Sequence, residues 1–323
     1  MPSWLNLINS DDFQSINGRL ERSDASQSES QNGFALLDSQ SILSVKGETA
    51  AKFLQGQSTA DMEALQVGDS TLGAICTNKG RVICNFRALK TEDSILLRMS
   101  ADLAEPTREY LTKFAVFFKT ELKVWEVPSV AVALTGESIS LDSLPANIWH
   151  TNGDAGSMEF YTESENAPAL FEFLNSQLDQ LSESDWYAQQ IRSGQTSINI
   201  CTTEKYLPHQ LNLDKSGAVS FTKGCYTGQE IVARTEYKGK TKRRVLPVLI
   251  STDLGDLHDL ELTTETEDGK AQQIELLMSA KTENDKSIAS LLLPVDFPQS
   301  GKLSANGKAV DYELASLPYP INE

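Results

Sequence analysis

The chain has 323 residues, of which 40% are hydrophobic and 23% charged, the ordinary balance of a globular protein with room for two or three domains. Its formal net charge of −17 repels nucleic-acid phosphates over most of the surface, so any contact with RNA has to use a local basic patch. No stretch approaches the roughly 20 apolar residues of a membrane helix, and the first residues lack the pattern of a secretory signal, so we expect a soluble, cytoplasmic protein.

The four cysteines, Cys76, Cys84, Cys201 and Cys225, form no C-x-x-C pair, and the chain has only three histidines. The spacing of a zinc site is therefore absent, and we expect no metal centre. A disulfide framework is not typical of a large chain without a secretion signal. The first three cysteines are interpreted as small buried residues, and the fourth belongs to a motif considered below.

The first 33 residues are polar and rich in Ser, Gln and Asp, which predicts a flexible N-terminal segment over residues 1–33. Between residues 41 and 127 the periodicity predicts strand, helix, two hairpin strands, strand, helix and strand. Asn78-Lys79-Gly80 suits the turn of the hairpin. This order is that of the ferredoxin-like split βαβ unit.

A second, looser version of the same unit follows, with strands predicted at 130–134 and 158–162 and a helix at 169–181. We therefore predict an α+β fold in which two ferredoxin-like halves form one region, residues 34–244.

The character of the sequence changes after Leu246, where short strands alternate with turns. Turn sequences occur at 267–269 and 305–307. This pattern predicts a C-terminal antiparallel β-barrel domain over residues 245–323.

The strongest local feature is an octapeptide, Lys223-Gly224-Cys225-Tyr226-Thr227-Gly228-Gln229-Glu230. Its two glycines let the backbone turn tightly and approach a ligand. The pair Thr227 and Glu230 predicts a capping box at the start of a helix. Cys225 would lie just before the positive end of that helix and close to Lys223, which favours the thiolate and modestly lowers its pKa. The alternative is a plain turn, a capped helix and a buried cysteine.

A second feature is a helix predicted over residues 184–194. Tyr187 and Ile191 share its inward face, whereas Trp186 falls on the polar side with Gln190. A large ring on the polar side of a helix is a candidate stacking platform for a flat heterocycle. The alternative is a tryptophan that packs beneath a neighbouring domain.

A third feature is a basic cluster in an otherwise acidic chain, made of Arg234, Lys238, Lys240, Lys242, Arg243 and Arg244. Such a cluster suits an anion, either a carboxylate-rich tail or an RNA phosphate. A solvated basic strand edge is the alternative.

The octapeptide, followed by Ala233-Arg234, resembles the signature of the YgfZ-type folate-binding, tRNA-modifying proteins. The resemblance extends over about residues 34–323, with supporting stretches at 53–61, 78–81, 113–117, 242–244 and 317–319. That family is similar in fold to the T-protein of the glycine cleavage system, an aminomethyltransferase that uses tetrahydrofolate.

The resemblance implies three domains around a folate-sized channel, with tetrahydrofolate or a derivative bound beside Trp186 and with Cys225 as a functional thiol in the channel. It also implies an accessory role for iron–sulfur enzymes, including those that thiolate tRNA, as partners. Membrane association and direct binding of tRNA are not expected. Two alternatives stay open: a folate-dependent one-carbon transferase that uses Cys225, and a non-catalytic interaction scaffold.

This sequence departs from the family pattern at three places. The acidic pair of the aminomethyltransferases corresponds to Cys84-Asn85, so no carboxylate is there to assist methylene transfer, which argues against that activity. A tryptophan of the first strand is replaced by Gln40. The acidic residue six positions after Trp186 is Arg192, which has no acceptor for the N–H groups of a pterin.

Overall fold

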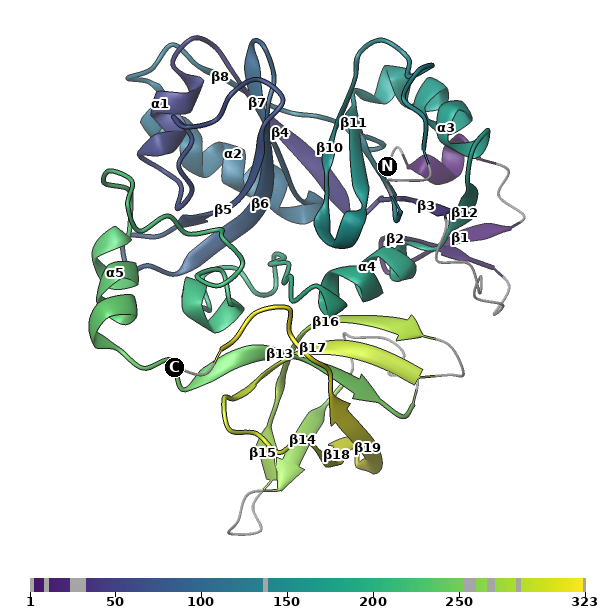
Figure 1. The fold of residues 1–323 in the computed structure, drawn as a ribbon, viewed down its shortest axis with the longest axis vertical. Coiled ribbons are helices and arrows are strands. Elements are labelled where there is room, and N and C mark those ends of the chain that lie inside the picture. Colours follow the sequence, from purple (N-terminus) through teal and green to yellow (C-terminus); the bar gives the residue numbers. More distant parts are fainter. Residues whose placement is uncertain are drawn as a thin grey trace.

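The computed structural model describes residues 3–8, 12–23, 33–135, 139–252, 260–265, 271–282 and 286–321. Two α+β lobes lie side by side above a C-terminal sheet, and one helix, α4, lies where they meet (Figure 1). Within these residues, no helix is long and apolar enough to span a lipid bilayer.

The first lobe is an antiparallel sheet in the order β5-β6-β7-β4-β8. Its elements are β4 (Gln40–Lys46), α1 (Ala50–Gln55), β5 (Ser70–Cys76), β6 (Val82–Lys90), β7 (Ser94–Ser100), α2 (Ala101–Ala115) and β8 (Glu121–Val124). The order β6-β7-β4-β8, with helices in the crossovers, is that of the split βαβ unit, and β5 and β6 form the predicted hairpin. Phe53, Leu54 and Leu111 bury the apolar faces of the two helices in the core of this lobe.

The second lobe is a mixed sheet in the order β10-β11-β9-β3-β12. Its elements are β3 (Gly33–Leu36), β9 (Val130–Ala133), β10 (Ile148–Asn152), β11 (Met158–Thr162), α3 (Ala167–Asn175) and β12 (Asp179–Leu181). The strand β3 precedes the first lobe in sequence, yet it pairs with β9 and β12. The prediction of a second, sequential copy of the first lobe is therefore wrong for this lobe.

The N-terminal residues correct the prediction of a flexible segment over 1–33. Residues 13–22 form the hairpin β1 (Phe13–Ile16) and β2 (Arg19–Arg22), and a 3-10 turn precedes them. The side chains of Trp4 and Leu20 are fully buried, and the indole of Trp4 donates to the carbonyl of Val130 at 3.1 Å. The burial of a few apolar side chains therefore orders this segment, although its average composition is polar. Residues 1–2, 9–11 and 24–32 of the predicted segment lie outside the part that the structure describes.

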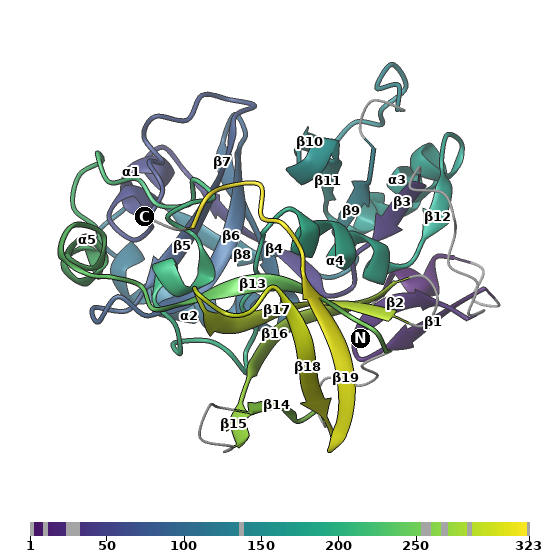
Figure 2. The ribbon, with the colours of Figure 1, turned by 60° about the horizontal axis from the view of Figure 1, so that its bottom comes forward.

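The C-terminal sheet has the order β15-β14-β18-β19-β13-β17-β16. Its strands are β13 (Arg243–Ile250), β14 (Leu262–Glu265), β15 (Ala271–Gln273), β16 (Glu275–Thr282), β17 (Lys286–Pro294), β18 (Ser300–Ala305) and β19 (Lys308–Leu314). Figure 2 shows the sheet curled beneath the lobes. Its edge strands β15 and β16 do not pair with each other in the described chain, so it is a curled half-barrel rather than the predicted closed barrel. The predicted turn at 305–307 joins β18 to β19, whereas 267–269 lies outside the described ranges.

The helix α4 (Glu183–Arg192) packs against β2, β3, β16 and β17. It begins one residue earlier than the predicted range of 184–194, with Ser182 as the N-cap and Asp185 completing a capping box. The buried carboxylate of Glu183 accepts the backbone N–H groups of Leu20 at 3.1 Å and of Ser39 at 3.2 Å. One side chain therefore links the N-terminal hairpin, the turn before β4 and the start of α4.

The last residues of the chain run back from β19 to the end of α4 (Figure 2). The hydroxyl of Tyr319 donates to the carbonyl of Gly194 at 2.6 Å. Gly194 has a φ of +69°, and a Cβ there would lie 2.6 Å from the Tyr319 oxygen, so both the turn and the close approach require glycine.

Candidate functional site

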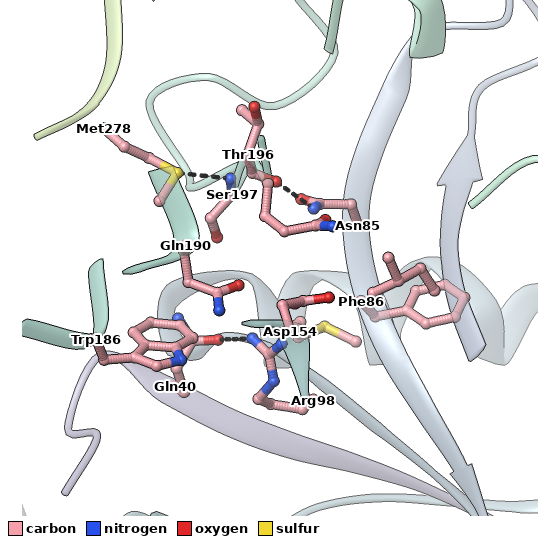
Figure 3. Close-up of a pocket in the computed structure, with 13 residues that line it drawn as sticks. Gln40, Asn85, Phe86, Arg98, Asp154, Trp186, Gln190, Thr196, Ser197 and Met278 are labelled. Carbon is pink, nitrogen blue, oxygen red and sulfur yellow. Dashed lines mark hydrogen bonds between the residues drawn. The ribbon is translucent and has the colours of Figure 1, made fainter. Parts of the chain in front are cut away.

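A narrow pocket lies where the two lobes meet α4 and the C-terminal sheet (Figure 3). Its polar lining includes Gln40, Asn85, Arg98, Asp154, Trp186 and Gln190. The cavity volume is about 30 Å³, which is room for about two water molecules. A larger ligand therefore enters only if the lining side chains move apart.

Trp186 lines this pocket together with Gln190, as expected for the polar side of α4. It is not an exposed platform, because its side chain is 1% exposed. The guanidinium of Arg98 lies over the ring, 5.3 Å from its centroid, and the ring of Tyr187 meets its edge at 4.8 Å between centroids. A flat ligand would stack against the part of the indole that faces the cavity.

Three side-chain polar atoms of the pocket lining are buried and have no hydrogen-bond partner among the residues that the structure describes. They are Nε1 of Trp186, Nε2 of Gln190 and Oγ1 of Thr196. A buried group left without a partner costs about 1–3 kcal/mol, so such groups are normally satisfied. A bound molecule that presents acceptor atoms to the two N–H groups would satisfy them.

A buried charge network joins the two lobes beneath the pocket. The fully buried carboxylate of Glu159, on β11, accepts from Nε of Arg87 at 3.0 Å and from Nε of Arg98 at 2.8 Å. Burial alone would raise the pKa of Glu159, but the two guanidinium groups outweigh it and hold that pKa below its ordinary value. Arg98 also donates to Oε1 of Gln40 at 2.9 Å, which fixes Gln40 in the pocket wall.

The position that carries an acidic pair in the aminomethyltransferases is structural here. The amide nitrogen of Asn85 donates to the carbonyl of Thr196 at 2.5 Å, and its oxygen accepts the N–H of Ile198 at 2.9 Å. The side chain of Cys84 is fully buried, and burial raises its pKa to about 11. Neither group is therefore free to exchange a proton with a ligand.

The third departure, Arg192, lies outside the pocket. Its side chain is exposed and does not line the cavity, although it follows Trp186 on the same helix. The substitution therefore does not bring a guanidinium against a bound ring.

The octapeptide is attached to the first lobe by Lys223. Its buried ammonium donates to the carbonyls of Gln55 at 2.7 Å, Ser58 at 2.8 Å and Ala60 at 2.7 Å. Burial lowers the pKa of Lys223 to about 8. The ring of the buried Tyr226 lies 5.2 Å from the same ammonium. The lysine therefore fixes the loop, and its hydrogen bonds are directed to the backbone.

The predicted capping box at Thr227 and Glu230 is wrong. The helix α5 (Gln229–Lys238) begins after Gly228, which has a φ of +85°, and no side chain caps it. Glu230 is exposed and pairs instead with Arg234 at 3.2 Å. A Cβ on Gly228 would lie 2.4 Å from the carbonyl oxygen of Thr77, so this turn needs glycine for its conformation and for its contact with the hairpin.

Cys225 is exposed, and the structure does not bring it together with Trp186, because Cys225 does not line the pocket. The predicted single site is therefore divided into a pocket and a separate surface thiol. Gly224 beside it is also exposed, and a Cβ there would meet no atom within 4 Å.

The remaining cysteines follow the prediction in part. Cys76 and Cys84 are buried, as expected, and burial raises the pKa of Cys76 to about 12. Cys201 is exposed, so the expectation that it is buried is wrong. Cys201 lies in a turn after Ile200. The usual burial of unpaired cysteines does not predict this exposed position.

The basic cluster separates into two parts. Arg244 is buried, and its two terminal nitrogens each lie 2.9 Å from a carboxylate oxygen of Asp214. Arg243 pairs with Glu275 at 3.4 Å. These two arginines are therefore structural, and the prediction of an anion site is wrong for them. The exposed part consists of Arg234, Lys238, Lys240 and Lys242, and Tyr237 beside Lys238 in the sequence is 70% exposed.

His209, Asp214 and Glu236 place ligand-type atoms within 4.8 Å of one another. Both oxygens of Asp214 are bound to Arg244, whose positive charge opposes a cation at this place. Nε2 of the His209 imidazole lies 3.0 Å from Oε2 of Glu236, within hydrogen-bonding distance. The group is therefore a polar link between α5 and β13 rather than a metal centre.

No family model matches the chain. Among solved structures, the fold is similar to glycine cleavage system aminomethyltransferase T from Bartonella henselae, with a TM-score of 0.67 and 16% identity over 90% of this chain and 86% of that chain. The two lobes, the curled sheet and the pocket between them thus define a protein of the T-protein fold. This likeness confirms the predicted α+β fold at the level of the whole chain.

Sequence relatives are more specific. The tRNA-modifying protein YgfZ of Vibrio atlanticus (strain LGP32) is 29% identical over 299 residues, 88% of this chain and 91% of that protein. The protein of the same description from Hamiltonella defensa is 30% identical over 227 residues, 64% of this chain and 67% of that protein. The chain belongs to the YgfZ family of tRNA-modifying proteins, which confirms the resemblance of the octapeptide.

Proposed function

We propose that this protein binds a folate and acts as an accessory protein for iron–sulfur enzymes, including those that thiolate tRNA. The observation that carries the proposal is the pocket, whose lining includes the indole ring of Trp186 and two buried donors without a partner in the described residues, Nε1 of that indole and Nε2 of Gln190. A pterin is a flat ring with acceptor atoms on its edge, so it would use both the stacking surface and the donors.

Tetrahydrofolate fits this pocket in chemistry but needs more room than the present cavity. The long side chains of Gln190, Gln195 and Met278 line it and open it most readily by changing rotamer. The charge network around Glu159 stays fixed, because both of its arginines are buried. We therefore expect the pocket to open on the side of α4 and β16.

The role in iron–sulfur metabolism is assigned to Cys225. An exposed thiol on a loop that Lys223 fixes to the first lobe is accessible to a partner protein. A lone thiol without an adjacent base is better suited to transient ligation of a partner's iron than to acyl or glycosyl transfer. The relatives' description as tRNA-modifying proteins supports an enzyme of tRNA thiolation as that partner.

A one-carbon transferase remains the rival function. It would need a reacting group at the ring, yet Cys225 does not line the pocket and both ends of the Asn85 amide are engaged by backbone. These contacts favour the accessory role over catalysis.

Titration calorimetry of the purified protein with tetrahydrofolate tests the proposal. We expect saturable binding with one site per chain and quenching of tryptophan fluorescence. Absence of binding at millimolar folate, with the protein folded, would exclude the folate site. Complementation of a deletion strain, read as thiolated tRNA nucleosides by mass spectrometry, tests the accessory role separately.

A further inference from the structure

Asp154 reaches the pocket from the second lobe. It begins the short turn between β10 and β11, and the turn is fixed by hydrogen bonds from Gly153 N–H to the Ser157 carbonyl at 2.8 Å and from Ser157 Oγ to the Asp154 carbonyl at 2.7 Å. Its side chain is 15% exposed and lines the cavity with Trp186 and Gln190 (Figure 3). The turn thus holds a carboxylate against the space where a ring would bind.

One oxygen of this carboxylate is engaged and the other is open. Oδ2 accepts from the guanidinium of Arg87 at 2.6 Å, and within the described chain no group donates to Oδ1. A carboxylate has about four acceptor positions, so Oδ1 has full capacity for a ligand. The Arg87 contact also fixes the orientation of the carboxylate, because Arg87 is itself held by Glu159.

Other strong acceptors near the pocket are already used. The oxygens of Glu159 accept from Arg87, Arg98 and Tyr161, and the amide oxygen of Gln40 accepts from Arg98. On the α4 side the unsatisfied buried nitrogens are donors. The pocket therefore presents donors from α4 and one open carboxylate oxygen from the turn at Asp154.

Resting on the proposed folate site, we propose that Asp154 is the specificity-determining residue, whose carboxylate accepts the 2-amino group of a 2-amino-4-oxopyrimidine ring. Such a ring has acceptor atoms on one part of its edge and an amino donor on another, which matches the two kinds of group around the cavity. Asp154 supplies the acceptor that the sequence lacks at Arg192, but from a different element. Pterin and guanine share this edge, and the proposed folate site favours pterin.

A ring with oxygen in place of the 2-amino group would set its lone pairs against the Asp154 carboxylate. Hydrogen bonds to charged groups contribute about 1.5–3 kcal/mol, which corresponds to a preference of roughly 10- to 100-fold. An amide at position 154 offers both a donor and an acceptor, so it accommodates either ring.

The test compares pterin-6-carboxylate with lumazine-6-carboxylate, which differ at position 2, by fluorescence titration of the full chain. We expect the wild-type protein to prefer the pterin by about 10-fold or more, and Asp154→Asn to reduce that preference to near unity. The ratio of the two affinities is the readout, because general damage to the pocket weakens both rings alike. Glu163→Gln, an exposed ion-paired acid at the end of the same lobe, should keep the wild-type ratio.

An unchanged ratio in Asp154→Asn, with pterin still bound, would overturn the inference and leave the proposed function standing. Failure of the wild-type protein to bind tetrahydrofolate or the pterin would remove both. Preferential binding of guanosine, lost in Asp154→Asn, would support the role of Asp154 and overturn the folate assignment.

Discussion

The ammonium of Lys223 donates a 2.7 Å hydrogen bond to the carbonyl oxygen of Ala60, 163 positions earlier in the chain. With the carbonyls of Gln55 and Ser58 it completes a set of backbone acceptors around one buried cation. The loop that ends α1 is thereby joined to the octapeptide. The octapeptide therefore holds Cys225 at a fixed place on the surface. Its lysine contacts backbone carbonyls and does not act on a ligand in the pocket.

Replacing Lys223 with methionine should destabilise the protein by about 2–4 kcal/mol, because three backbone carbonyls, two of them in buried contacts, lose a charged donor. Urea unfolding followed by circular dichroism measures the change. Lys238→Met removes an exposed cation and should stay within about 0.5 kcal/mol of wild type. Equal stability of the two variants would show that the carbonyls find other partners.

The two glycines of the octapeptide should respond differently to alanine. Gly228→Ala forces a Cβ into the Thr77 carbonyl at a positive φ, which we expect to cost about 2 kcal/mol or more. Gly224→Ala meets no atom and should change stability by less than about 0.5 kcal/mol. Thermal unfolding of both variants checks this, and a Gly228→Ala protein as stable as wild type would contradict the geometry.

Alkylation should distinguish the four cysteines in the native protein. Cys225 and Cys201 are exposed and should react, whereas Cys76 and Cys84 are buried with raised pKa values and should react only after unfolding. Mass spectrometry of iodoacetamide-treated protein gives the order in which the four cysteines are alkylated. Rapid labelling of a buried cysteine would show that the first lobe opens under native conditions.

Cys225→Ala should fold normally but fail to restore thiolated tRNA nucleosides in a deletion strain. Cys201→Ala is the matched control, since it removes the other exposed thiol and should restore them. Mass spectrometry of digested tRNA provides the measurement. Full complementation by Cys225→Ala would reduce the thiol to a surface residue without function.

Trp186 should contribute to folate affinity through stacking and through its N–H. Trp186→Ala should weaken tetrahydrofolate binding by roughly 1–3 kcal/mol, on the scale of base stacking on aromatic rings. Trp186→Phe keeps an aromatic surface but lacks the unpartnered donor, so we expect a smaller loss. Calorimetry on variants shown to be folded gives the affinities. If both Trp186 variants bind tetrahydrofolate with wild-type affinity, the pterin ring does not bind against Trp186.

Glu183 should make stability depend on pH. Burial raises its pKa to about 8, compared with about 4.3 for glutamate in an unfolded chain. Between these two pH values Glu183 holds a proton in the folded state but not in the unfolded state. The contribution of Glu183 to the free energy of unfolding is therefore complete below about pH 4 and is lost as the pH rises through about 8. The loss is at most about 1.4 kcal/mol per pH unit. Glu183→Gln should lack it, and parallel stability curves from about pH 5 to 8 would refute the shift.

Local pattern was enough to predict the first lobe. The hairpin at Asn78-Lys79-Gly80, the helix α1 and the split βαβ order depend on short-range periodicity and turn chemistry, and the structure confirms them. The pairing of β3 with β9 and β12 was missed, because it joins segments about a hundred or more residues apart and leaves no local signal. The N-terminal hairpin was missed because averaging over a polar segment hides single anchors such as Trp4.

The site was predicted in part for the same reason. The polar-side position of Trp186 follows from helical spacing, and the pocket contains it. Asp154 and the carbonyl contacts of Lys223 were missed, because a turn residue acquires its role only when another lobe closes against it, and backbone carbonyls are not encoded by side-chain type. A carboxylate beside Gly153 in a tight turn is the one local signal that points to Asp154.

The pocket wall extends from Gln40 on the first strand of one lobe to Met278 on β16 of the C-terminal sheet. A ribosome therefore has to release nearly the whole chain before the cavity exists. A chain that ends before β16 therefore lacks part of the wall and cannot form this pocket, although it contains the octapeptide with Cys225.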